Sequence, residues 1–210
     1  MTRLRHAAVL LTGCTLVGLL AACASGMDAG AAPDAPVGQS LGSLDPGLPD
    51  GEVIAEGTVL EDSDGARVCF AVMESYPPQC GGLPVAGWSW DGLDGAETAN
   101  GVTWGAYAVQ GTYDGEVLTV TEPPVLLALY DPMMREDPTG GEPGDTDEAT
   151  LLSLEEELPE RLGDQLLGWW PQDGRMWAQV IWDDGTWQDA ADADYGEGAV
   201  IIQPWLREVG

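Results

Sequence analysis

Short alternations of apolar and polar residues fill the region from residue 52 to residue 122. Alternation of this kind over about four to eight positions is typical of half-buried β-strands. The dipeptides Asp64-Gly65 and Asp114-Gly115 each separate two such segments, which predicts two tight hairpins. The segment 92–101 has room for one helical turn. The predicted strands are 52–60, 66–73, 84–90, 103–113 and 116–122.

The order of these elements indicates a particular kind of β-fold. Five short strands with a small helix after the third strand are the order of an OB-type Greek-key barrel. We therefore expect residues 52–122 to form a small five-stranded OB-like β-barrel lobe. A simple β-sandwich is the alternative that the same strands allow.

Residues 123–210 mix strand-like and helix-like segments, so the predicted fold class is α+β. Leucines recur at helical spacing after residue 148, with Thr146 and Asp147 as candidate caps and Pro159 as an expected kink or break. The resulting order, β-α-β-β-α-β, is typical of a ferredoxin-like lobe. The predicted elements are strand 123–130, exposed acidic loop 131–147, a helix from 148, a hairpin of strands 166–170 and 175–182, a turn and short helix over 183–196, and strand 199–206.

The first 22 residues have the pattern of a secretory signal peptide. Two arginines precede an uncharged run over 7–22, which is too short to span a bilayer comfortably. The run ends in Leu20-Ala21-Ala22-Cys23, which resembles the lipobox of bacterial lipoproteins. The resemblance implies that Cys23 carries a diacylglycerol, becomes the first residue after cleavage, and holds the protein on the extracytoplasmic face of the cell membrane. An ordinary signal peptide with a chance cysteine and an uncleaved anchor helix are the alternatives.

Residues 23–51 have the composition of a flexible linker. From Ala24 to Gly51 the chain contains six glycines, four prolines and no aromatic residue. Such a segment lacks the apolar side chains that a packed core needs. Random-coil scaling gives it a reach of about 30 Å.

The charge balance excludes several kinds of partner and of chemistry. The whole chain has a net charge of −29, and beyond residue 22 it has five arginines, no lysine and no histidine against 36 acidic residues. Nucleic acid requires a cationic surface, which five scattered arginines do not provide. Hydrolases that use histidine and Schiff-base enzymes that use lysine are excluded by the missing residues. We expect no cofactor and no bound metal, because no acidic segment has the spacing of a calcium loop. A carboxylate-based hydrolase acting on cell-wall polysaccharide remains as an alternative function.

Two cysteines remain once cleavage removes Cys14 and Cys23 is assigned to the lipid. An exported protein is in an oxidising compartment, so Cys69 and Cys80 are expected to form a disulfide. A metal site is the alternative, but no third soft ligand lies nearby in the sequence.

Nine tryptophans give the chain a set of candidate binding residues. Trp88 and Trp90 are two positions apart, so on a strand they share one face, and Trp177 alternates with buried positions of a predicted strand. An exposed indole stacks on sugars or peptides, whereas a buried one fills the core. Trp88, Trp90 and Trp177 are therefore candidates for a ligand surface, with core packing as the alternative that we favour.

Several segments resemble those of uncharacterised secreted lipoproteins of actinobacteria. They are the segment 75–82, "SYPPQCGG", the segment 111–124, "GTYDGEVLTVTEPP", and the end of the chain. The resemblance covers most of residues 52–205 and brings no known activity. The sequence thus favours a membrane-anchored envelope lipoprotein that is not an enzyme and that binds an envelope protein or a glycan.

Overall fold

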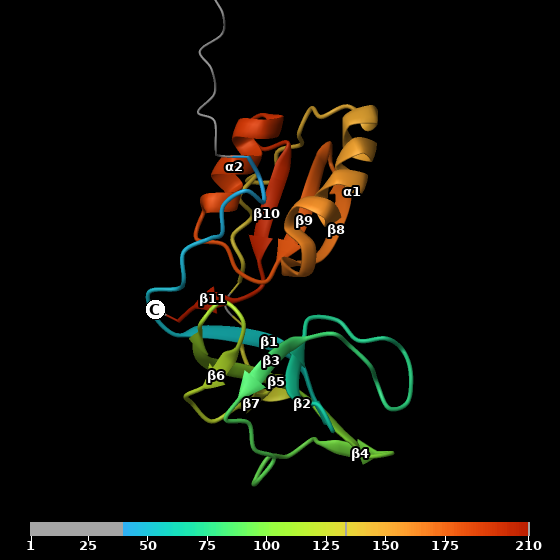
Figure 1. Ribbon diagram of the computed structural model, residues 1–210, viewed down its shortest axis with the longest axis vertical. Coiled ribbons are helices and arrows are strands. Elements are labelled where there is room, and N and C mark those ends of the chain that lie inside the picture. Colours follow the sequence, from blue (N-terminus) through green and yellow to red (C-terminus); the bar gives the residue numbers. More distant parts are fainter. Residues whose placement is uncertain (1–39, 133, 210) are drawn as a thin grey trace, which may run out of the picture. The chain divides into compact units, whose positions relative to one another are not determined.

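The structure is a computed structural model that describes residues 40–209, with the exception of residue 133. The predicted signal peptide 1–22, the predicted lipid site Cys23 and the first part of the predicted linker lie outside the described residues. None of the helices in the described part of the chain combines the length and the apolar character needed to cross a bilayer. Figure 1 shows the two sheets on which the fold is built.

The first sheet closes into a five-stranded barrel, as the sequence predicts. The pairing runs β1-β2-β3-β6-β5, and β1 pairs again with β5 to close the ring. All of these pairs are antiparallel except β3 with β6, which is parallel. This arrangement fits an OB-like barrel. The barrel strands are β1 (Val53–Asp62), β2 (Gly65–Cys69), β3 (Leu83–Ala86), β5 (Val102–Tyr113) and β6 (Leu118–Val120).

Strand β1 closes the barrel by pairing with β2 and with β5. Its second half faces β2 on one side and β5 on the other. Gly57 lies within β1, where a Cβ atom would stand 2.2 Å from the carbonyl oxygen of Cys69. Only glycine therefore allows this approach of β1 to the end of β2. The interior is filled by apolar residues such as Val59, Val68 and Val109, all fully buried.

Three short strands extend the barrel sheet. The segment 92–101 forms no helical turn and instead leads into β4 (Glu97–Ala99), which pairs with the start of β5. Strand β7 (Val125–Leu126) pairs with the middle of β5 and precedes the 3-10 helix η1 (Leu127–Leu129). Strand β11 (Arg207–Glu208) pairs with the start of β1. The last strand thus returns the chain to the barrel. The barrel sheet therefore includes two strands, β7 and β11, that lie outside the predicted range 52–122.

The second sheet has three strands, in the order β10-β9-β8. Strands β8 and β9 form the predicted hairpin, and β10 runs parallel to β9. Both α-helices contribute to one apolar cluster, together with Met176, Ala178 and Val180 of β9, so they cover the same face of the sheet. The elements are α1 (Glu148–Leu162), the 3-10 helix η2 (Gly163–Gln165), β8 (Leu166–Gln172), β9 (Arg175–Val180), α2 (Thr186–Tyr195) and β10 (Val200–Pro204).

The ferredoxin-like arrangement predicted for this lobe is not confirmed. Its first strand, expected over 123–130, becomes β7, which lies in the barrel sheet (Figure 1). Strand β7 pairs with β5, where Tyr107 lies opposite Leu126. Leu126 packs against the barrel core. The apolar pattern indicated a strand correctly, but pattern alone does not say which sheet a strand joins.

Helix α1 begins as predicted and does not break where predicted. Asp147 caps it by accepting hydrogen bonds from the backbone N–H groups of Ala149 and Thr150. Pro159 lies inside the helix, which continues to Leu162. Leu158 and Leu162 flank the proline and are both buried in the cluster beneath α1, so packing on either side offsets the lost hydrogen bond.

Residues 40–51, the end of the predicted flexible linker, pack along the second lobe and form a strap. Leu41 is only 2% exposed and joins the apolar cluster under the helices. The indole N–H of Trp187 donates to the carbonyl of Leu44 at 2.7 Å, and that of Trp182 donates to the carbonyl of Gly47 at 2.8 Å. Residues 40–51, which the sequence predicts as part of a flexible linker, are therefore in contact with the second lobe.

The free edge of β10 is occupied by a side chain. Gln188 of α2 donates from its amide nitrogen to the carbonyl of Val200 at 3.0 Å, and its amide oxygen accepts from the N–H of Ile202 at 2.8 Å. One glutamine thus makes the two hydrogen bonds that a neighbouring strand would make.

The barrel and the second lobe share buried residues. Ile181, which follows β9, and Trp205, which follows β10, both belong to the barrel core. The indole N–H of Trp205 donates to the carbonyl of Glu56 at 3.0 Å, and Arg207 forms an ion pair with the carboxylate of Glu56. These contacts hold the elements on both sides of the boundary against each other.

Candidate functional site

The loop between β2 and β3 exposes apolar side chains and is fixed by a disulfide. Cys69 and Cys80 are bonded, with Cα atoms 6.1 Å apart, which confirms the predicted pairing. Within the loop, the N–H of Met73 donates to the carbonyl of Gln79 at 2.9 Å. The exposed apolar residues of this disulfide loop are Phe70 (42% exposed), Val72 (38%), Met73 (61%) and Tyr76 (72%).

The sequence indicated this loop only in part. The strand predicted over 66–73 ends at Cys69, which is the last residue of β2 to pair with β1. Phe70 and Met73 therefore leave the sheet instead of alternating within it. The apolar pattern alone suggested a strand here, whereas the cysteine spacing was the signal for a loop.

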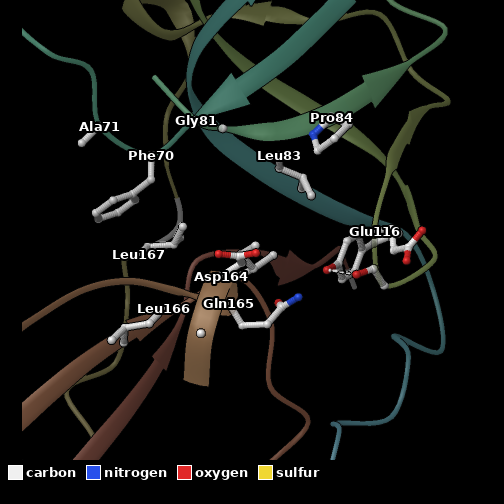
Figure 2. Close-up of a pocket in the computed structure, with 15 residues that line it drawn as sticks. Phe70, Ala71, Gly81, Leu83, Pro84, Glu116, Asp164, Gln165, Leu166 and Leu167 are labelled. Carbon is white, nitrogen blue, oxygen red and sulfur yellow. Dashed lines mark hydrogen bonds between the residues drawn. The ribbon is translucent and has the colours of Figure 1, made fainter. Parts of the chain in front are cut away.

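Phe70 stands at the edge of a cleft of about 750 Å³. One wall comes from the barrel, with Phe70 and Leu83, and the other comes from η2 and the start of β8 (Figure 2). In Figure 2, Asp164 and Gln165 extend into the space between these walls. The cleft is therefore apolar on both sides with polar groups between them, which is the composition typical of binding sites. Its other lining residues include Leu166, Leu167 and Ile181.

A second cavity, of about 400 Å³, adjoins the cleft. The two share the lining residues Tyr113, Gly115, Glu116 and Gln165, so they adjoin at these residues, and we refer to the pair of cavities as the groove. The strap supplies one side of the second cavity through residues 45–48, and the indoles of Trp182 and Trp187 supply another. The groove therefore runs from Phe70 of the disulfide loop to Leu48 of the strap.

The turn between β5 and β6 forms the middle of the groove and has a fixed geometry. The hydroxyl of Tyr113 donates to the carbonyl of Gly115 at 2.7 Å. Asp114 accepts from the N–H of Val117 at 2.8 Å and from that of Glu116 at 3.0 Å. These N–H groups, that of Val117 foremost, hold the pKa of Asp114 below its usual value, and burial raises the pKa of Tyr113.

The groove contains carboxylates and no cation. Glu116 and Asp164 line the cleft, and Asp45 and Asp114 line the adjoining cavity. All five arginines of the described residues are bound elsewhere in the fold. Their partners are Asp62 for Arg67, the carbonyls of Pro204 and Trp205 for Arg135, Asp194 for Arg161, the carbonyl of Gly198 for Arg175 and Glu56 for Arg207.

The predicted aromatic residues lie away from this groove. Trp88 and Trp90 are half-buried against the barrel core, with ring centroids 5.1 Å apart and an angle of 78° between the planes. Trp90 donates from its indole N–H to Glu61 at 2.6 Å, while Ser89 between them is exposed. The two rings therefore meet edge to face and each also packs edge-on against Tyr107.

Trp177 lies on the face of the second sheet that points away from the helices, opposite Trp170 of β8. It is half-buried, and its indole nitrogen is buried without a hydrogen-bond partner among the described residues. The structure does not bring Trp177 together with Trp88 and Trp90 in one cavity.

Other titratable groups have structural roles. Asp183 is 9% exposed, and its carboxylate accepts from the N–H of Trp187 at 2.9 Å at the start of α2. Burial raises the pKa of Asp183. Within the part of the chain that the structure describes, no three histidine, cysteine, aspartate or glutamate side chains are grouped so as to hold a metal ion.

Comparison of the chain with protein-family models, with curated proteins and with solved structures found no match in any of the three. The function must therefore be argued from the groove and from the residues that line it.

Proposed function

We propose that the chain is a lipid-anchored binding module of the extracytoplasmic face, with the groove beside the disulfide loop as its ligand site. Cys23 carries the anchor, and an envelope protein or a glycan is the ligand. The resemblance to secreted actinobacterial lipoproteins and the composition of residues 1–23 support the location.

One observation carries the choice of the binding site. Phe70 is 42% exposed at the edge of a cleft of about 750 Å³, in a loop that a disulfide fixes. Exposed apolar residues that lie together often mark binding sites, as Phe70, Val72 and Met73 do in this loop, and a fixed loop loses little conformational entropy when a ligand binds. Both properties favour a preformed recognition surface.

The proposal of binding without catalysis is supported by the side chains that are available. Residues 23–210 contain no histidine and no lysine. The competing function, a carboxylate-based hydrolase of cell-wall polysaccharide, would need two acids placed across a sugar ring. Glu116 and Asp164 are the acids of the cleft and are therefore the pair to test. Turnover of peptidoglycan or glycans that disappears in both Glu116→Gln and Asp164→Asn would establish the hydrolase and overturn our proposal.

The binding site is tested by filling the cleft. Ala71 lines the cleft and is exposed, so Ala71→Trp adds bulk there without entering the barrel core. Ala96 is also exposed and lines neither cavity, which makes Ala96→Trp the matched control. We expect a panel of peptidoglycan fragments, glycans and peptides to contain a ligand whose affinity falls at least tenfold in Ala71→Trp and is unchanged in Ala96→Trp. Equal binding by both variants would show that the cleft is not the site.

The anchor is tested separately by mass spectrometry of the protein extracted from membranes. We expect an N-terminal peptide that begins at Cys23 and carries the mass of a diacylglycerol. A product that retains Met1, or one released without lipid, would contradict the anchor while leaving the cleft untouched.

A further inference from the structure

The groove has a shape and a charge that restrict its ligand further than the proposed function does. Its two cavities, of about 750 and 400 Å³, meet at the turn that carries Glu116. Two adjoining cavities that together reach from the disulfide loop to the strap suit an extended chain better than a compact small molecule. The site therefore favours a segment of several residues.

The walls leave room for the backbone of such a segment. Gly81 and Gly163 line the cleft on opposite sides, and open space lies where a Cβ atom would stand at each of them. Glycines at such positions allow another backbone to come close. Apolar residues that line the cleft, Phe70 and Leu167 among them, provide contacts for apolar side chains of the ligand.

The charge of the groove has one sign. The cleft is lined by the carboxylates of Glu116 and Asp164, and the adjoining cavity by those of Asp45 and Asp114. No arginine lines either cavity. Every arginine of the described residues has a partner elsewhere in the fold. An anionic ligand would be repelled by these carboxylates, whereas a cationic one would be attracted to them. A cationic group is the complement that the groove lacks.

We infer that the groove binds an extended peptide segment of a partner protein in which arginine or lysine alternates with apolar residues. The apolar side chains pack between Phe70, Leu83 and Leu167, and the cations face Glu116 and Asp164. This inference rests on the proposed function and narrows its ligand from an envelope protein or glycan to a basic, apolar peptide segment.

The test uses an eight-residue, fluorescein-labelled peptide of alternating leucine and arginine. A second peptide has citrulline in place of arginine, which keeps the shape and removes the charge. Fluorescence anisotropy is measured with the full chain in phosphatidylcholine nanodiscs, with empty nanodiscs as the blank. We expect the arginine peptide to bind at least tenfold more tightly than the citrulline peptide, and the difference to shrink in 0.5 M salt as the charges are screened.

Variants locate the charges that matter. Glu116→Gln and Asp164→Asn are expected to weaken binding of the arginine peptide by about two- to fivefold each, the range for one exposed ion pair. Glu156 is exposed on α1 and lines neither cavity, so Glu156→Gln changes the net charge equally and is expected to have no effect. Equal effects of all three substitutions would reduce the binding to general attraction by an acidic surface and would overturn the inference.

The failure of the inference can be told from the failure of the proposed function. Equal affinity for the citrulline and arginine peptides, or binding of neither, overturns the basic peptide as ligand. The proposed function stands in that case if Ala71→Trp still abolishes binding of another ligand from the panel. It falls if Ala71→Trp has no effect on any ligand.

Discussion

Replacement of Leu41 by alanine tests whether the strap is part of the folded body. Leu41 is 2% exposed and packs in one cluster with Leu158 and Leu162 of α1. The substitution removes three buried carbon atoms, which costs about 2 kcal/mol at about 0.8 kcal/mol per methylene, and the remaining cavity adds about 1 kcal/mol. We therefore expect Leu41→Ala to lower the free energy of unfolding by about 3 kcal/mol.

Urea unfolding of the full chain, followed by circular dichroism, measures this loss. For an m-value of about 2 kcal/mol/M, the midpoint should fall by about 1.5 M. Leu44 is 43% exposed in the same strap, so Leu44→Ala is the control and should change the free energy by less than about 0.5 kcal/mol. If Leu41→Ala is no more harmful than Leu44→Ala, residues 40–51 are a loose tether and our description of the strap is wrong.

Three further predictions concern the disulfide and two ionisable groups. Replacing Cys69 and Cys80, which are 11 positions apart, by serine should cost about 3 kcal/mol in urea unfolding, the chain-entropy value for such a loop; an unchanged midpoint would refute it. The N–H of Thr150 holds the pKa of Asp147 below 3.8, so the stability that this cap contributes is present above pH 3.8 and is lost as the pH falls through the lowered pKa. In acid unfolding, the free energy of unfolding of Asp147→Asn should therefore fall less steeply with decreasing pH than that of the unmodified chain. Burial raises the pKa of Tyr195 from 10.0 to about 12, so the stability that the protonated hydroxyl contributes is present below pH 10 and is lost as the pH rises toward 12. Phenylalanine does not ionise, so the free energy of unfolding of Tyr195→Phe should fall less between pH 10 and pH 12 in alkaline unfolding.

The barrel was predictable because its signals are local. Asp64-Gly65 and Asp114-Gly115 mark hairpins whose strands lie next to each other in the sequence, and the observed pairs of β1 with β2 and of β5 with β6 follow from them. Asp147 as the cap of α1 was predictable for the same reason, since an N-cap bonds to N–H groups two and three residues ahead.

The features that the sequence did not reveal depend on contacts between distant residues. Val125 and Leu126 form a strand, but their partner is β5 of the barrel. Leu41 lies in a segment of glycine and proline, and only the apolar cluster of α1, β9 and α2 makes it a core residue. Pro159 is tolerated because buried leucines lie on both sides of it.

Of the candidate site, only the disulfide was predictable from the sequence. The sequence predicted the disulfide between Cys69 and Cys80, and the structure contains it. The cleft combines Phe70 with Asp164 and Leu167. Phe70 lies about a hundred positions before the other two in the chain, so the three residues come together only through the contact between the two sheets. The sequence named Trp88 and Trp90 as ligand-surface candidates while favouring core packing for them; in the structure both are half-buried against the barrel core and pack edge-on against Tyr107.

The amide of Gln188 has a consequence for neighbouring copies of the protein. Strand β10 is an edge strand, and unpaired edge strands recruit strands from other molecules into growing sheets. Because Gln188 already occupies the carbonyl of Val200 and the N–H of Ile202, a foreign strand must first displace it. On the other edge of the sheet, Pro171 of β8 has no N–H to offer. Both edges of this sheet are thereby protected against edge-to-edge aggregation without the use of any of the chain's few positive charges.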